Sequence, residues 1–185
     1  MRWEGLFADL EAQASQLAAA ARGAEVEERG RIEVGTIGLV DRLRPALGAA
    51  ITLRCRAGVT VTGCIRRVNL QWLLIAEDGG REALVPIAAI VAVSGLGRLS
   101  AVPNTMGPVE SKLGITHALR GVARDRSAVR MLLADSTVLD GTLDRVGADF
   151  VEVSVHAPGE PRRHREVRDV VVVAISAIVV LRRDA

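Results

Sequence analysis

Hydrophobic and polar residues alternate in short runs through the middle of the chain, and this alternation predicts β-strands. Ile51–Cys55 and Val59–Ile65 have the two-residue period of half-buried strands. Arg56-Ala57-Gly58 between them fits a three-residue hairpin loop with glycine in the left-handed conformation. Three more short strands are predicted, at Trp72–Ala76, Arg81–Val85 and Ile90–Val93. Five short strands of this size are typical of a small, strongly curved barrel.

The same pattern returns 78 residues later in the chain. The first-copy positions Ile51, Leu53, Cys55, Val61, Gly63, Ile65, Val68 and Trp72 correspond to Val129, Met131, Leu133, Leu139, Gly141, Leu143, Val146 and Phe150. After the third strand the offset becomes 88, so that Ile87 and Ile90 correspond to Ile175 and Ile178. The extra residues lie between Ala157 and Arg168, where a loop lengthens at little cost in free energy. We therefore predict two tandem copies of one β-unit.

The N-terminal segment has a different period, which predicts an amphipathic helix. Apolar residues recur at alternating spacings of four and three, as in a heptad repeat, at Trp3, Phe7, Leu10, Ala14, Leu17 and Ala21. A single helix must bury such a stripe against something. Two alternatives are open: the stripe packs on the first β-unit, or it pairs with a helix of another subunit. In the second case Trp3, Phe7, Leu10 and Leu17 are the oligomerisation residues.

The spacing of the β-units resembles a known family. Gly58, Val61, Gly63, Ile65 and Val68, followed by Trp72 and Leu74-Ile75, resemble the first Sm motif of the Sm/LSm (Hfq-like) superfamily, and the second copy repeats this spacing with Ser136, Leu139, Gly141, Leu143, Val146, Phe150 and Val153. Sm proteins normally carry an RNA-binding aspartate and asparagine where this chain has Asn69 and Leu73, and Gly147 and Val151 in the second copy. The usual RNA-pocket residues are therefore lacking.

The resemblance implies a mainly β fold with an N-terminal α-helix and two tandem Sm-like five-stranded small barrels. The expected domains are an N-terminal amphipathic helix at 1–34, a first barrel at 35–95, a linker rich in glycine, proline and serine at 96–113, and a second barrel at 114–185. Because neighbouring Sm-type units pair through their edge strands, we expect the two copies either to pair with each other or to join copies in other chains. Three tandem chains would then mimic a six-membered ring.

Composition and charge narrow the function. The formal net charge is +2, with acids and bases interspersed, whereas dedicated nucleic-acid modules are usually more basic. The first residues carry acids too early for a signal peptide, and the longest apolar runs are shorter than the roughly 20 residues of a membrane span. We therefore expect a cytoplasmic protein without a membrane partner. Cys55 and Cys64 point to opposite faces of their predicted hairpin, which predicts two free thiols in a reducing compartment.

The sequence offers little catalytic chemistry. His117, His156 and His164 have no partner at a spacing that would assemble a metal site, and no nucleophile is accompanied by a base and an orienting group. We therefore expect no enzymatic activity, no metal and no cofactor.

Arginine-rich groups are the remaining candidates for a binding site. Arg54, Arg56, Arg66 and Arg67 lie on the first predicted hairpin, and Arg162, Arg163, Arg165 and Arg168 lie in the long loop of the second copy. They are interpreted either as phosphate contacts or as ordinary solvated residues in a chain where arginine is the default cation. The leading hypothesis is a non-enzymatic assembly or adaptor protein of a bacterial cytoplasm, with a homo-oligomer or another protein as partner. The alternative is an RNA- or DNA-binding regulator that uses the arginine-rich rim and loop.

Overall fold

A computed structural model describes residues 11, 13, 15–17, 22, 25, 34–103, 113–156 and 169–183. The chain divides into two compact units, Met1–Gly38 and Leu39–Ala185. In the first unit the described residues from Glu11 to Thr36 are helical, and the side chain of Leu17 is exposed. Trp3, Phe7 and Leu10 lie outside the described residues, so their role in oligomerisation stays a prediction. The predicted domain boundaries likewise stay a prediction.

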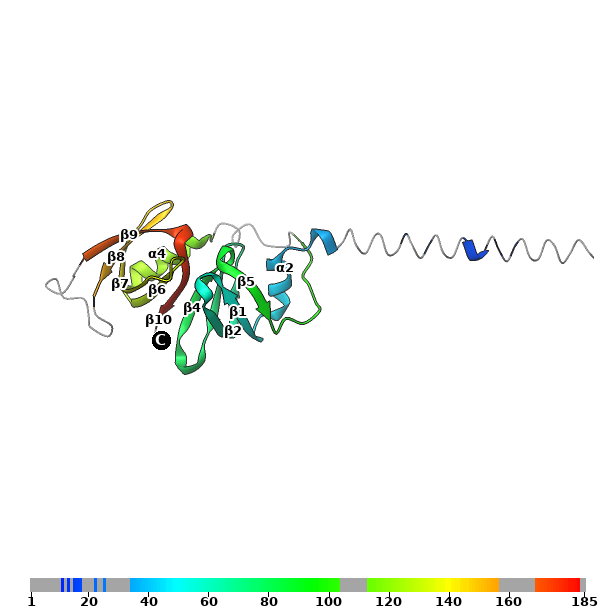
Figure 1. Cartoon of the computed structure of the whole chain (residues 1–185), viewed down its shortest axis with the longest axis horizontal. Helices are drawn as coiled ribbons and strands as arrows, with labels where there is room; N and C mark the ends of the chain where they lie inside the picture. Colours follow the sequence, from blue (N-terminus) through cyan, green and yellow to red (C-terminus); the bar gives the residue numbers. More distant parts are fainter. Residues whose placement is uncertain are drawn as a thin grey trace, which may run out of the picture. The chain divides into compact units, whose positions relative to one another are not determined.

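The second unit contains all the strands that the structure describes (Figure 1). Its first half comprises helix α2 (Leu39–Leu43), the 3-10 turn η1 (Arg44–Ala46), β1 (Ala50–Cys55), η2 (Arg56–Gly58), β2 (Thr60–Val68), β3 (Trp72–Ala76), η3 (Asp78–Gly80), β4 (Glu82–Pro86), η4 (Ile87–Ala89) and β5 (Ile90–Ser94). Its second half comprises α4 (Ile115–Asp125), β6 (Ala128–Leu133), β7 (Val138–Val146), β8 (Phe150–Val155), β9 (Asp169–Ala174), η5 (Ile175–Ala177) and β10 (Ile178–Arg183). The five strands predicted for the first copy are confirmed, with small shifts at their ends.

The prediction of two five-stranded barrels is wrong. The ten strands form one antiparallel sheet in the order β5-β1-β2-β3-β4-β10-β6-β7-β8-β9, and this sheet is open, with β5 and β9 at its edges. A closed first barrel would need β4 to pair with β5. Instead β4 pairs with β10, the last strand of the second half, so the edge that would close the barrel joins the two halves. Of the two alternatives, the structure shows the two copies pairing with each other through β4 and β10, and joining to copies in other chains stays a prediction.

The two halves repeat the same strand register. In the first half Ile51 is opposite Gly63 across the β1–β2 pair, and in the second half Val129 is opposite Gly141 across β6–β7. The irregularities repeat as well, because β2 has a bulge between Ile65 and Arg67 and β7 has one 78 residues later. Each half therefore has the same internal strand order, and the predicted repeat extends to the positions of its bulges.

Two hydrophobic cores lie on opposite faces of the strands at the junction. The first core includes Leu53, Val61 and Ile65 and also receives Val179 and Val180 from β10. The second core lies under α4 and receives Ile178 and Leu181 from the same strand; its other members include Leu119, Met131, Leu143 and Val153. Strands β3 and β4 are shared in the same way, since Trp72 and Leu84 belong to the second core. Each half therefore completes the other's core.

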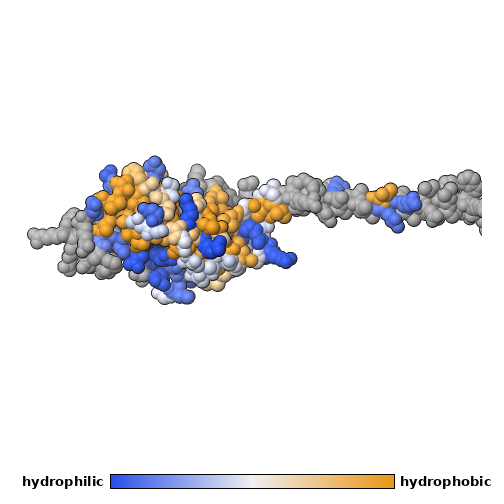
Figure 2. All heavy atoms as spheres, viewed as in Figure 1, coloured by the Kyte–Doolittle hydropathy of each residue, from blue (hydrophilic) through white to orange (hydrophobic). Residues whose placement is uncertain are grey.

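Apolar side chains also reach the surface of this unit, where they alternate with hydrophilic patches (Figure 2). The exposed large residues of the strands are Val91 on β5, Val138 on β7, and Val170 and Val172 on β9. Three of these four lie on the two edge strands. The edges of the sheet are thus apolar, which is a hazard for a protein unless something covers them.

Candidate functional site at the junction of the two halves

The junction consists of three residue pairs between β4 and β10, reinforced by ion pairs. Leu181 lies opposite Leu84, and Arg183 lies opposite Glu82. Arg182 forms a two-pronged ion pair with Glu77, with Nε to Oε2 at 2.8 Å and Nη2 to Oε1 at 3.1 Å. Both side chains are largely buried, which strengthens their attraction relative to a surface pair. The ion pairs fix the register in which the halves meet.

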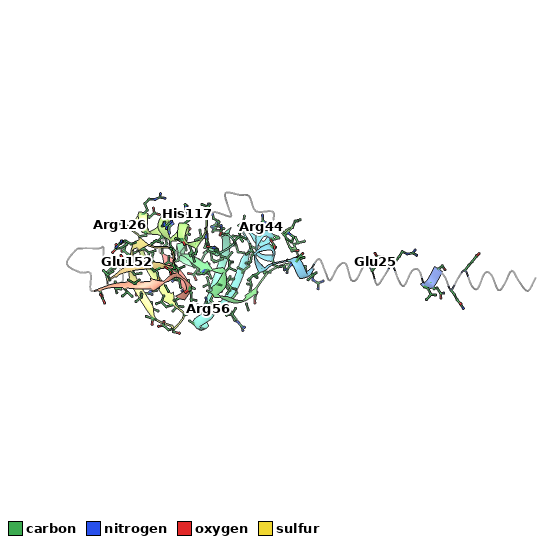
Figure 3. The ribbon with its side chains drawn as sticks, turned by 90° about the horizontal axis from the view of Figure 1, so that it is seen from above. Glu25, Arg44, Arg56, His117, Arg126 and Glu152 are labelled. Carbon is green, nitrogen blue, oxygen red and sulfur yellow. The ribbon has the colours of Figure 1, made fainter. Side chains whose placement is uncertain are left out.

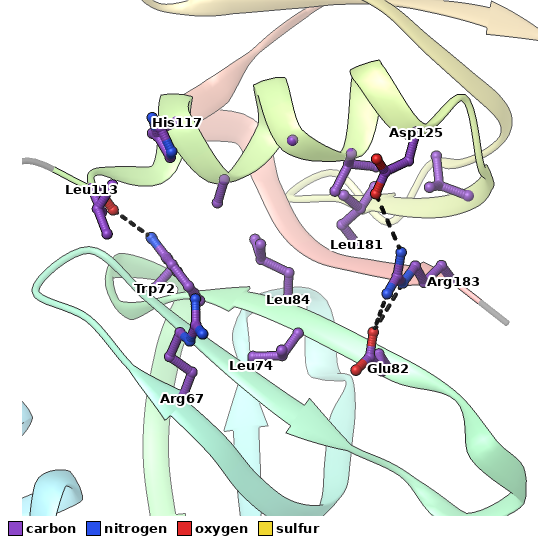
Figure 4. A pocket seen from close by; sticks show the side chains of 14 residues that line it. Arg67, Trp72, Leu74, Glu82, Leu84, Leu113, His117, Asp125, Leu181 and Arg183 are labelled. Carbon is purple, nitrogen blue, oxygen red and sulfur yellow. Dashed lines mark hydrogen bonds and ion pairs between the residues drawn. The ribbon is translucent and has the colours of Figure 1, made fainter. Parts of the chain in front are cut away.

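A cavity of about 270 Å³ lies beside this junction, between α4 and the strands of both halves (Figure 4). Its walls are mostly apolar, and charged side chains stand at its margins. The lining residues are Arg67, Trp72, Leu74, Glu82, Leu84, Leu113, His117, Ala118, Gly121, Val122, Asp125, Val129, Leu181 and Arg183. The site therefore draws on both halves of the sheet.

Each end of the cavity has a distinct structure. At one end the indole Nε1 of Trp72 donates a hydrogen bond of 3.0 Å to the carbonyl oxygen of Leu113, which fixes the ring as a wall, and Arg67 lies beside it (Figure 4). At the other end Arg183 lies 2.8 Å from the Glu82 carboxylate and 3.8 Å from that of Asp125. The positive charge of Arg183 is thus compensated within the protein, and the two carboxylates leave this end with a formal excess of one negative charge.

Helix α4 forms the roof of the cavity. Its start is held by Gln71 of the first half, whose Oε1 accepts a hydrogen bond of 2.9 Å from the backbone N–H of Ile115. This side chain satisfies one of the amide groups that a helix start leaves without an intrahelical partner. Its buried residue Leu119 anchors the helix in the second core. The first half therefore positions a helix of the second half.

The predicted arginine site is not a single cluster. Arg54, Arg56, Arg66 and Arg67 are all exposed, but Arg67 lines the cavity under α4 whereas Arg56 lines a second hollow beside Gln71, Ile87 and Asp149. In Figure 3, Arg56 is labelled on the opposite side of the unit from His117. Arg162, Arg163, Arg165 and Arg168 lie outside the described residues, so their role stays a prediction.

Sequence reasoning missed most of the cavity residues. Trp72 matches a repeat position of the first copy, but the core that it joins belongs to the other half. The sequence analysis did not single out Glu77, Glu82 or Arg183, because nothing in their spacing shows that the halves meet there. A signal was present in Gly121, a glycine inside the amphipathic pattern of a helix, where it weakens the helix without an evident reason.

The two free edge strands carry exposed apolar residues whose counterparts in the other half, 88 residues away in the repeat, are buried at the junction. Leu84 of β4 is 7% exposed, whereas Val172, its counterpart on β9, is 63% exposed. Val179 of β10 is fully buried, whereas Val91, its counterpart on β5, is 59% exposed. The exposed residues thus occupy positions whose counterparts are buried in the two cores at the β4–β10 junction.

Outside the cavity, the shifted pKa values of Cys55 and Asp135 follow from local burial and hydrogen bonding. Cys55 and Cys64 are both free, and burial raises the pKa of the Cys55 thiol to about 11, with a smaller opposing effect from Arg182. The pKa of Asp135 is lowered by hydrogen bonds from Thr137, whose backbone N–H donates to Oδ1 at 2.9 Å within a turn. In the described part of the chain, no group of three or more histidine, cysteine, aspartate or glutamate side chains is placed to hold a metal ion.

The part of the chain that the structure describes also contains no helix with the length and apolar character needed to cross a membrane. No family model matches the chain, and no curated protein matches its sequence.

Proposed function

We propose that this chain is a non-enzymatic assembly protein whose copies join through their sheet edges, β9 of one molecule pairing with β5 of the next. The internal β4–β10 pair is the template, because β9 is the counterpart of β4 and β5 is the counterpart of β10. In that arrangement Val172 of one chain lies opposite Val93 of its neighbour, as Leu84 lies opposite Leu181 within the chain. The observation that carries the proposal is the exposure of Val172 and Val91, whose counterparts are buried.

The physical driving force is the apolar area of the two edges together with their unpaired backbone groups. An edge strand presents N–H and C=O groups that pair readily with another strand. Burying one valine side chain contributes on the order of 1.5 kcal/mol or more. Several such side chains and a ladder of backbone hydrogen bonds at each contact favour association, offset by the loss of translational freedom.

The two edges differ from each other, so the proposed association is head-to-tail. Such contacts generate rings if the rotation between neighbours closes and open filaments if it does not. A ring of three chains would place six β-units around one axis. The Sm-like resemblance is retained as a proposal about origin, supported by the repeated strand order and register of the two halves.

Charge distinguishes the internal junction from the proposed contact between chains. The junction residues Arg182 and Glu82 have Ser94 and Val170 as their counterparts on the free edges. A charged strand placed opposite an apolar edge would leave its charge without a partner, which costs free energy. The ion pairs thus favour correct pairing of the two halves within a chain and leave β5 and β9 for each other.

Sedimentation velocity of the full chain over a range of concentrations tests this proposal. We expect the wild-type chain to form oligomers and Val172→Lys to sediment as a monomer, because a charge in the middle of β9 opposes pairing. Val138→Lys is the matched control, since Val138 is similarly exposed but lies on β7, which is inside the sheet. A wild-type chain that stays monomeric at every concentration, or equal effects of the two substitutions, would contradict the proposal.

Nucleic-acid binding is the second candidate. It is favoured by the exposure of Arg54, Arg56, Arg66 and Arg67, none of which forms an ion pair in the part of the chain that the structure describes. Phosphate contacts of this kind give binding that weakens steeply with salt. An electrophoretic titration with single-stranded RNA at two salt concentrations tests it. Binding lost in Arg54→Gln/Arg66→Gln supports it, and no binding at low salt removes it.

A further inference from the structure

We propose that the cavity under α4 is a binding site for a small molecule with an apolar body and one anionic group, the anion lying at Arg67. This site is independent of the sheet edges and of the assembly proposed above. Three separate features carry the inference: the build of the walls, the glycine in the roof, and the distribution of charge between the two ends.

The walls form a defined, mainly apolar space. Trp72, Leu74 and Leu84 line it from the first half, and Val122 and Leu181 line it from the second. Its volume of about 270 Å³ is close to the lower bound of ligand pockets, about 300 Å³. The indole ring of Trp72 is held by its hydrogen bond to Leu113, so this wall is formed before any ligand arrives. A compact apolar group of roughly ten non-hydrogen atoms suits this space.

The roof contains a glycine that the fold does not require. Gly121 lies in the interior of α4, where glycine costs up to about 1 kcal/mol relative to alanine. Its backbone is not in the left-handed region, and an added Cβ would meet no atom within 4 Å. Neither conformation nor packing therefore explains the residue. Its effect is to leave the cavity open beneath the helix. A residue that disfavours its own secondary structure without a compensating contact is typical of functional sites.

The charges at the two ends select the sign of the ligand. Arg183 is neutralised by Glu82 and Asp125, which both approach it. Arg67 at the other end is exposed and has no ion pair among the described residues. His117 lies on the helix at the same end as Trp72 (Figure 4). The site therefore presents one available cation beside an apolar space, which fits a carboxylate, sulfonate or phosphate attached to an apolar body.

Octanoate is a suitable probe, with octan-1-ol and octylammonium as its neutral and cationic analogues. Trp72 is one of two tryptophans, so Trp3→Phe in the full chain makes the fluorescence of Trp72 the readout. We expect a saturable change with octanoate at an affinity about tenfold higher than with octan-1-ol, and none with octylammonium. A tenfold ratio is the size expected of one charge-assisted contact that remains partly solvated.

Four substitutions decide the result. Arg67→Gln should reduce the affinity for octanoate about tenfold and leave that for octan-1-ol unchanged, whereas Arg66→Gln, on the neighbouring exposed arginine, should change neither. Gly121→Leu should abolish binding by filling the cavity, and Gly121→Ala, which improves the helix, should keep the fold and weaken binding less. Equal affinities for octanoate and octan-1-ol, full binding in Gly121→Leu, or no saturable change with any probe would overturn the inference.

Discussion

Gly63 and Gly141 occupy equivalent positions in the two halves, and both lack a side chain for the same steric reason. A Cβ on Gly63 would lie 2.1 Å from the carbonyl oxygen of Ala76, and one on Gly141 would lie 2.3 Å from that of Ser154. Both oxygens belong to the backbone of the neighbouring strand, so they cannot swing aside as a flexible side chain would. The close approach is part of the strand curvature in each half.

Replacing either glycine by alanine should therefore destabilise the fold. We expect Gly63→Ala and Gly141→Ala each to lower the free energy of unfolding by about 1–3 kcal/mol, the cost of forcing extra volume into a packed region. Urea denaturation followed by circular dichroism measures this. Gly97→Ala is the control, because its Cβ would meet no atom within 4 Å, and it should change the midpoint little. Similar midpoints for all three variants would contradict the steric argument.

Cys55 gives the protein a pH dependence in the alkaline range. Burial raises the pKa of its thiol from 9.0 to about 11, so between these values the unfolded chain loses this proton while the folded protein keeps it. Stability from this group is therefore fully present below pH 9 and is lost as the pH rises towards 11, by on the order of 2 kcal/mol. The chain has no tyrosine and a single lysine, Lys112, so few other groups titrate there.

Urea midpoints at pH 8 and pH 10.5 measure this dependence. We expect the wild-type protein and Cys64→Ser to lose stability between these values. Cys55→Ala should start from a lower stability, because it leaves a small cavity, but its midpoint should change less with pH. A Cys55→Ala variant with the full alkaline loss would assign that loss to another group.

At the scale of elements, the ion pair between Arg182 and Glu77 should bind the two halves more strongly than a surface pair. Its bidentate geometry and partial burial favour it, whereas Arg145 and Glu152 meet at 3.5 Å with the arginine exposed. A double-mutant cycle with Arg182→Gln and Glu77→Gln should give a coupling free energy of about 1–2 kcal/mol. The same cycle on Arg145 and Glu152 should give about 0.5 kcal/mol or less. Equal values would place the strength of the junction in its apolar contacts.

The strands were predictable because their signal is local. Alternation of apolar and polar residues located β1 to β5, and the repeat located the second set, since both depend on side chains within one strand. Closure was not predictable in the same way. Whether β4 pairs with β5 or with β10 depends on the competition between two edges nearly a hundred residues apart, and the ion pair that favours β10 joins Glu77 to Arg182.

The site was less predictable than the fold because it is assembled across the junction. Arg67 was selected from sequence as one member of an arginine group, yet its neighbours in space are Trp72 and residues of α4. The lining residues come from both halves, so no motif at a fixed spacing describes them. Among the lining residues, Gly121 alone departs from the pattern expected of its helix. The reason for this glycine becomes visible only in the structure, where open space lies at the position its Cβ would take.

At the scale of the whole molecule, the sheet has two different edge strands, and each of them pairs with a neighbouring strand on one side only. β5 has β1 as its neighbour, and β9 has β8. Because the internal junction already joins a β9-like strand to a β5-like strand, the chain contains a working example of the contact proposed between molecules. A blocked edge should therefore stop growth in one direction and leave the other edge competent.

This asymmetry makes a prediction about mixtures. Val172→Lys blocks β9 and leaves β5 free, and Val91→Lys blocks β5 and leaves β9 free, so each variant alone should remain monomeric. Mixed in equal amounts, the two variants should form a one-to-one dimer that grows no further. Each chain has one unblocked edge, and the single contact in the dimer uses both of them. Multi-angle light scattering measures the molar mass of the species formed. The control is Val172→Lys alone at the same total protein concentration. Oligomers larger than a dimer in the mixture, or no dimer, would show that copies do not join head-to-tail through these two strands.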